Sequence, residues 1–166
     1  MRLRFIGIDP GYSGGIGVIT VDPETRTESA EAYKMPRGNR DLLELLAYLK
    51  KGVDDDISVW LEQVHSMHGQ GVKSTWTFAE HFGALKMALT AEMGGEFIQV
   101  RPQIWQKELG CLTKGDKNVT KLMATRLFPR LKITHAIADA LLVAHYGRLE
   151  SGWPILPLEG MGNDLV

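Results

Sequence analysis

The stretch that most constrains the fold is IGIDPGYSGGIGV, from Ile6 to Val18. A run of apolar residues ends at Asp9, a glycine-rich connection follows, and a second apolar, β-branched run begins at Ile16. Two such runs joined by a short connection that contains glycine are typical of paired strands. The chain is therefore expected to open with two antiparallel strands and to carry a carboxylate at the end of the first.

The rest of the chain predicts a third strand and then alternating helices and strands. A strand over 28–35 would complete an antiparallel meander of three. The further predicted elements are a helix from Asp41 to Gly52, a strand over 57–62, a helix from Ser74 to about Met93, a strand over 96–100, a short helix over 102–109, a helix from Asp116 to Pro129 and a helix from Thr134 to about Leu149. The strand over 57–62 follows a helix, so it is expected to run parallel to the first strand.

Length and composition indicate a soluble globular protein. The 166 residues suit one core and are too few for two of ordinary size, and 44% hydrophobic with 23% charged residues excludes a disordered chain. No apolar run could span a bilayer, and the N-terminus has no signal-peptide cleavage site, so we expect a cytoplasmic protein without a membrane partner. We expect one domain over 1–150 and a loosely ordered tail over 151–166. The single cysteine, Cys111, excludes an internal disulfide.

Three acidic residues occupy positions from which they could meet. Asp9 and Glu62 end the first and fourth predicted strands, and Asp139 lies one turn into the last helix, on the same face as His135. If the two strands are parallel neighbours, both carboxylates lie at the same edge of the sheet. Crowded carboxylates repel one another, and Mg²⁺, which prefers oxygen ligands, relieves that repulsion. Two such ions about 4 Å apart would hold the attacking and leaving oxygens of a phosphodiester.

Each of these residues also has an ordinary structural interpretation. An aspartate before Pro-Gly is a common turn residue, His135 can face solvent, and Asp139 can be a surface acid that the helix dipole favours. Glu62 is the stronger candidate, because an acid that ends an apolar strand is costly to bury without a partner. The prediction of a site depends on the coincidence of these residues in one topology.

Four landmarks, in this order, resemble those of the RuvC-type Holliday-junction resolvases. They are IGIDPGYSGGIGV (6–18), LEQV (61–64), VRP with GDK (100–102 and 115–117) and HAIADALLVA (135–144). Together they extend from about Arg4 to Tyr146, which is most of the chain. The pattern looks closest to the phage and chloroplast branches of this family.

The resemblance implies an α/β protein with a ribonuclease H-like fold: a mixed five-stranded sheet, its first three strands antiparallel, flanked by helices. It also implies a homodimer that resolves four-way DNA junctions by paired, symmetric, metal-dependent nicks, leaving 5′-phosphate and 3′-hydroxyl ends. By this match Asp9, Glu62 and Asp139 would be metal ligands, and His135 would be the fourth catalytic and metal-binding member of the set. Two Mg²⁺ ions per site are expected, with Mn²⁺ as the alternative ion. The protein would act in a bacterium or a phage-infected host cell.

The spacing of the last pair departs from the family pattern. His135 and Asp139 are four residues apart, where family members usually have a spacing of three. Both spacings keep the pair on one face of a helix. The sequence leaves open whether His135 binds metal, orients a water molecule or takes up a proton.

Basic residues are concentrated in one segment. The whole chain has a net charge of -1, yet residues 101–132 hold eight basic residues and two acidic ones, a local charge of +6. Such a segment would attract phosphate. The predicted DNA contacts here are Lys107, Lys114, Lys117 and Lys121, and Lys117, which matches the lysine of the family, is also expected to neutralise charge on the cut phosphate.

The loop after Glu62 would lie at the rim of the site. Its predicted DNA contacts are His65, Met67, His68 and Lys73, either with a reduced base-stacking role or as a polar loop without base contact. Trp105, in the predicted helix over 102–109, is expected to be a core residue. Paired cuts need a two-fold dimer. The helix from Ser74, with Trp76 and Phe82, either forms that interface or is buried within one subunit.

Three other classes of function share part of this pattern. A sugar-kinase or actin-like nucleotide binder also begins with a strand, an aspartate and a glycine loop, but it uses the fold twice, and this chain has room for one copy. A broader ribonuclease H-like nuclease acting on flaps, branched DNA or RNA–DNA hybrids would share every catalytic residue. A catalytically inactive junction-binding module is the third class, and the presence of three acids argues against it.

Overall fold

The computed structural model describes residues 2–50, 56–64 and 71–153. The elements are, in chain order, β1 (Leu3–Asp9), β2 (Gly15–Asp22), β3 (Thr27–Lys34), α1 (Asn39–Lys50), β4 (Asp56–Glu62), α2 (Val72–Met93), β5 (Ile98–Val100), α3 (Pro102–Glu108), α4 (Asn118–Leu127) and α5 (His135–Glu150). This order of strands and helices is the predicted one.

The strands form one mixed sheet in the order β3-β2-β1-β4-β5. β1 pairs antiparallel with β2, and β2 pairs antiparallel with β3. β4 runs parallel to β1, and β5 runs parallel to β4. The predicted five-stranded sheet, with three antiparallel strands first and the fourth strand parallel to the first, is confirmed.

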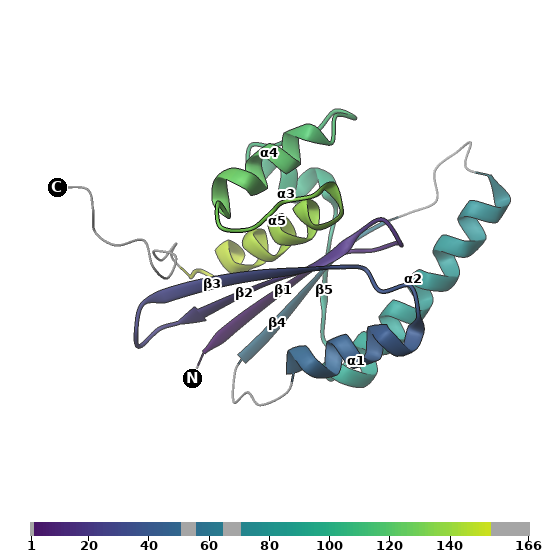
Figure 1. Ribbon diagram of the computed structural model, residues 1–166, viewed down its shortest axis with the longest axis horizontal. Coiled ribbons are helices and arrows are strands. Elements are labelled where there is room, and N and C mark those ends of the chain that lie inside the picture. Colours follow the sequence, from purple (N-terminus) through teal and green to yellow (C-terminus); the bar gives the residue numbers. More distant parts are fainter. Residues whose placement is uncertain (1, 51–55, 65–70, 154–166) are drawn as a thin grey trace.

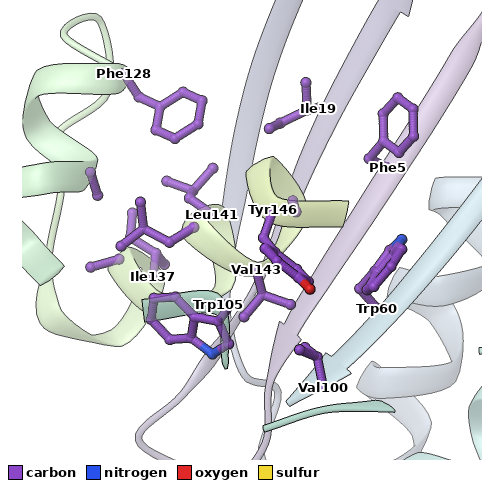
Figure 2. Close-up of a cluster of buried hydrophobic side chains, with 14 of the residues drawn as sticks. Phe5, Ile19, Trp60, Val100, Trp105, Phe128, Ile137, Leu141, Val143 and Tyr146 are labelled. Carbon is purple, nitrogen blue, oxygen red and sulfur yellow. The ribbon is translucent and has the colours of Figure 1, made fainter. Parts of the chain in front are cut away.

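Helices cover both faces of the sheet (Figure 1). α3, α4 and α5 lie over one face, and α1 and α2 lie over the other. Successive residues of a strand point to opposite faces, so Phe5 belongs to the apolar cluster under α5 and Ile6 to the cluster under α1 and α2. Figure 2 shows the first cluster, in which the rings of Trp60 and Tyr146 meet edge to face with centroids 5.6 Å apart.

α5 lies unusually close to the sheet because the strands beneath it carry glycines. A Cβ atom added to Gly7 would lie 2.1 Å from the backbone nitrogen of Ala144, and one added to Gly15 would lie 2.5 Å from the carbonyl oxygen of Ala136. Gly15 is the residue of β2 that pairs with Asp9. The first turn of α5 is thereby held directly over the end of β1.

A buried ion pair fixes the opposite end of α5. Arg148 is completely buried and forms a salt bridge with Glu28 of β3. Its guanidinium nitrogen also lies 3.0 Å from Nδ1 of His145. Burial, and then the neighbouring Arg148, lower the pKa of His145 to about 4, so its ring is neutral and can accept this hydrogen bond. Removal of either charged partner would leave the other buried without the opposite charge that offsets its desolvation.

Some boundaries differ from the predicted ones. α2 begins at Val72 and not at Ser74, with Gly71 in an extended conformation at its N-cap. Lys117, rather than Asp116, occupies the N-cap position of α4, although a carboxylate oxygen of Asp116 accepts a hydrogen bond from the backbone nitrogen of Asn118 at 2.9 Å. β5 has three residues because its pairing with β4 is limited to Trp60–Glu62.

No helix in the described part of the chain is long and apolar enough to cross a membrane. The last described residue is Trp153, so most of the expected tail over 151–166 lies outside the described residues. The expected domain boundary at residue 150 stays a prediction.

We expect Gly7→Ala to destabilise the fold by about 3 kcal/mol or more, because the added methyl group overlaps the backbone of α5 and can be accommodated only if the helix moves. Urea denaturation measures this loss. Gly83→Ala is the matched control: nothing lies within 4 Å of a Cβ atom there, and the change should stabilise α2 by about 0.5–1 kcal/mol. Equal stability of Gly7→Ala and wild type would contradict the close docking of α5.

Candidate active site

Three carboxylates from distant parts of the chain lie within electrostatic reach of one another at one edge of the sheet. Asp9 is the last residue of β1 and Glu62 the last residue of its parallel neighbour β4. Asp139 lies in the second turn of α5, whose first turn is held over Gly15, the partner of Asp9. The charges of Glu62 and Asp139 both act on the Asp9 carboxyl group. The structure therefore brings these three predicted residues together.

Burial raises the pKa of all three carboxyl groups. The pKa of Asp9 lies well above its ordinary value, first because the group is buried and then because Glu62 and Asp139 are negative neighbours. Burial is also the main cause that raises the pKa of Glu62 to about 7 and that raises the pKa of Asp139. Removal from water and mutual repulsion both disfavour the charged forms. A cation placed among these groups would favour their charged forms.

Trp105 orients one of the three carboxylates. Its indole Nε1–H donates a hydrogen bond to Oε2 of Glu62 at 2.9 Å, and the ring is completely buried. This bond lowers the pKa of Glu62 against the effect of burial. The prediction that Trp105 is a core residue is confirmed, and Figure 2 shows its ring among the apolar side chains under α5. Its contact with Glu62 was not predicted.

Two basic side chains border the carboxylates. Lys117 is exposed at the N-cap of α4, and its charge lowers the pKa of Asp9, Glu62 and Asp139. His135 is the exposed first residue of α5, and its charge lowers the pKa of Asp139. Both residues therefore lie within electrostatic reach of the acidic cluster, as their predicted roles require.

The donor set fits a hard divalent cation. Three carboxylates supply oxygen ligands only, and Oδ1 of Asp139 is buried without a hydrogen-bond partner in the described part of the chain. Within residues 2–50, 56–64 and 71–153, no three histidine, cysteine or carboxylate side chains already surround one point in the way a bound ion requires.

The other predicted DNA contacts lie in different parts of the surface. Lys107 on α3 and Lys114 in the loop before α4 are exposed, whereas Lys121 on α4 is half-buried. Lys73 is exposed in the first turn of α2, which covers the other face of the sheet (Figure 1). His65, Met67 and His68 lie outside the described residues, so their contact with bases stays a prediction.

We expect Trp105→Phe to raise the pKa of Glu62 above about 7, because the hydrogen bond that favours its charged form is lost. Carbon-13 NMR titration of the glutamate carboxyl groups in metal-free protein measures this shift. Trp60→Phe is the control, since the Trp60 indole N–H donates to Ser58 Oγ at 2.9 Å and not to a carboxylate. If Glu62 titrates identically in both variants, Trp105 does not orient it.

Glu62 should also make stability depend on pH. Its pKa rises from 4.5 to about 7 on folding, so the folded state holds the proton more tightly. The corresponding stabilisation is present below pH 4.5 and is lost as the pH rises through 7. Without divalent cations, we expect Glu62→Gln to be more stable than wild type by about 3 kcal/mol at pH 8, and equally stable near pH 4.

Thermal unfolding in EDTA at these two pH values measures the difference. Glu44→Gln provides the control. Glu44 and its salt-bridge partner Arg40 are both exposed, so this change should alter the free energy of unfolding little at either pH. A Glu62→Gln protein that is less stable than wild type at pH 8 would contradict the proposed cost of this buried charge.

At the level of sequence, the chain matches no protein-family model and no curated protein. Solved structures do match it. Thermus thermophilus RuvC in complex with a Holliday junction substrate is similar with a TM-score of 0.57 and 15% identity, over 93% of this chain and 99% of that chain. A second Thermus thermophilus RuvC structure has a TM-score of 0.55 and 19% identity, over 95% and 100%.

These matches extend over nearly the whole of both chains. The strand order and the helices on both faces of the mixed sheet agree with them. At this level of identity the likeness establishes the fold alone. The chain has the ribonuclease H-like fold of RuvC, as the sequence landmarks predicted.

Proposed function

We propose that this protein is a metal-dependent endonuclease that resolves four-way DNA junctions. The observation that carries the proposal is the convergence of Asp9, Glu62 and Asp139 beside Lys117 at one edge of the sheet. Acids partly or wholly withdrawn from water, with a neighbouring lysine, suit phosphodiester hydrolysis better than they suit a structural role. The RuvC fold and the phage- and chloroplast-like landmarks support branched DNA as the substrate.

Asp9, Glu62 and Asp139 would hold Mg²⁺, or Mn²⁺ in its place, with two ions per site. Such ions lower the pKa of bound water and stabilise charge on a phosphate. The hydrogen bond from Trp105 would favour the ionised form of Glu62 and orient its carboxylate. Lys117 would place positive charge beside the phosphate that is cut. His135, at the rim, would hold a water molecule or accept its proton on the imidazole ring.

The basic segment around Lys117 would position the DNA. Phosphate contacts fix the register of a protein on DNA, and their strength falls with salt. We assign this role to Lys107, Lys114, Lys117 and Lys121, and also to Lys73 and to His65, Met67 and His68 of the segment after Glu62. An active site that is lined by acids needs such basic borders to accept a polyanion.

A two-fold dimer would place two active sites on one junction. α2 buries His81, Leu85 and Leu89 against the rest of the subunit, yet Trp76 is 72% and Met87 66% exposed. Exposed apolar side chains along one helix favour a contact with a second copy of the chain. We therefore assign the dimer interface to the outer face of α2.

Sedimentation analysis of wild type and Trp76→Glu tests this interface. The wild type should sediment as a dimer and Trp76→Glu as a folded monomer, because the interface would have to bury the new charge. Leu122→Glu, which changes an exposed apolar residue on α4, should remain dimeric. A monomeric wild type would exclude the dimer.

The activity is tested with end-labelled four-way junction, Y-fork, linear duplex and RNA–DNA hybrid, each with and without Mg²⁺. We expect paired, symmetric, ligatable nicks in the junction alone. Asp9→Asn should lower the rate at least about 10³-fold, because it removes a ligand charge from the reacting centre. Asp41→Asn is the control: Asp41 is exposed in the first turn of α1 and is not one of the acids of the site, so this variant should keep wild-type activity.

Other patterns of cutting would point to the alternative functions. Cutting of the hybrid, or of every branched form, would keep the acidic site and make the protein a broader ribonuclease H-like nuclease. Selective binding of the junction without cutting by the wild type would make it a junction-binding module.

A further inference from the structure

A groove of about 480 Å³ lies at the opposite end of the strands from the acidic cluster. Leu3 at the start of β1 and Asp56 at the start of β4 line it, whereas Asp9 and Glu62 end these two strands. The segment before β5 and the first residues after α5 complete its wall. This groove, which we call the edge groove, therefore belongs to a part of the molecule that the proposed activity does not use.

The edge groove lies where one side of β4 has no strand beside it. β5 pairs only with residues 60–62, so residues 56–59 have a strand neighbour in β1 alone among the described elements. An open strand edge is a template for association with other chains, and folded proteins usually cover it. A segment that filled the groove would cover this edge.

The side chains of the edge groove are mostly apolar. Leu3, Phe5 and Val59 are buried, whereas Ile98 is 49% exposed. The charged groups in the described part of the wall are two carboxylates, from the start of β4 and from Glu96. Burial of the apolar surface is favourable, and carboxylates repel a polyanion. The groove therefore suits an uncharged apolar segment and not DNA.

The end of α5 directs the main chain to this groove. Gly152 has a φ of 74°, its backbone N–H donates to the carbonyl of Leu149 at 2.9 Å, and the N–H of Trp153 donates to that of Arg148 at 3.3 Å. This pair of bonds is the Schellman arrangement, which ends a helix at a left-handed residue. Ser151 and Trp153 line the groove, and Trp153 packs against the core under α5. The chain therefore continues from the wall of the groove.

The next five residues have the composition that the groove requires. They read PILPL (154–158), five apolar residues without a charge or a polar side chain. Such a run is unfavourable when it is left in water. Five extended residues reach at most about 18 Å, and the groove crosses two strand spacings, roughly 10 Å. The run is therefore long enough to fill the groove.

Attachment to the same chain favours this run over a peptide from another protein. A short connection gives an attached segment an effective concentration of about millimolar at its site. Pro154 and Pro157 each fix one backbone φ angle, so less conformational entropy is lost when the run is held in place.

We propose that segment 154–158 docks in the edge groove of its own chain and covers the open edge of β4. Ile155, Leu156 and Leu158 supply the apolar side chains that the groove buries. The two prolines lack a backbone N–H, so side chains and not a complete strand ladder make the contact. The folded domain then extends to residue 158 instead of 150. The proposal goes beyond the proposed nuclease activity and does not depend on it.

Paramagnetic relaxation enhancement locates the segment directly. Gly160→Cys would carry a nitroxide label just beyond the segment in the full chain. The native Cys111 does not compete for the label, because it is buried and its burial raises the thiol pKa to about 11. The label should broaden the amide signals of residues 56–59 and 95–98. The signals of residues 11–14, at the opposite end of β1, should stay sharp.

A mixed sample separates docking within one chain from docking between chains. It contains spin-labelled protein without ¹⁵N and unlabelled protein with ¹⁵N, and it should show no broadening. Broadening at the groove in this sample would mean that the segment enters a second copy. Absence of selective broadening in the labelled ¹⁵N protein would mean that the segment does not occupy the groove. Either result would overturn the proposal.

A double-mutant cycle tests the same contact through stability. Ile155→Ser combined with Leu156→Ser should raise the equilibrium constant of unfolding about 10- to 100-fold in urea, because buried apolar surface is lost. Ile98→Ser should raise it as well, and all three changes together should have less than the product of the separate effects.

Ile104→Ser is the matched control for the cycle. Ile104 on α3 is 51% exposed, close to the 49% of Ile98, and does not line the groove. Its effect should multiply independently with that of the serine pair. If Ile98→Ser also combines independently, or if the serine pair leaves unfolding unchanged, the segment does not dock in the groove.

Discussion

The close docking of α5 on the glycines of β1 and β2 determines the rest of the structure. Gly7 and Gly15 let the helix backbone approach the strands to a distance that no side chain would permit. This approach closes one apolar core and holds the first turn of α5 beside the end of β1. The buried pair of Arg148 and Glu28 fixes the other end of the helix. The helix cannot shift along the sheet without disturbing one of these contacts.

The position of the acidic cluster depends on that docking, and the charges of the cluster destabilise the folded state. Desolvation raises the pKa of Asp9, Glu62 and Asp139, which means that their ionised forms destabilise the folded state. Trp105 and Lys117 offset part of this cost through a hydrogen bond and a positive charge. Buried charges that a fold stabilises only in part are typical of sites whose ligand completes them.

Much of the fold could be predicted because its signals are local. Runs of apolar and β-branched residues identified the strands, and a strand placed after a helix implied the parallel pairing of β4 with β1, which the structure confirms. The convergence of Asp9, Glu62 and Asp139 followed from that topology and from the helical spacing of the last acid. Their roles as ligands, and the DNA contacts of the lysines, stay predictions.

What the sequence did not reveal depends on tertiary contacts. The bond from Trp105 to Glu62 joins residues 43 positions apart, and only the need of a buried indole for a partner hinted at it. The environment of His81 arises from the packing of the loop after β1 on α2, to which no local pattern points. The start of α2 was placed two residues late because Gly71 caps it through backbone conformation, without the side-chain signal that Ser74 offered.

The most direct test of the account is the binding of Mn²⁺ to the purified protein, followed by electron paramagnetic resonance. Wild type should bind two ions per chain whose spins couple, as ions about 4 Å apart do. Asp139→Asn should lose this coupled pair, and Asp41→Asn should keep it. If the wild type binds no ion, or if Asp139→Asn binds the same coupled pair, then α5 does not complete a cation site with the ends of β1 and β4.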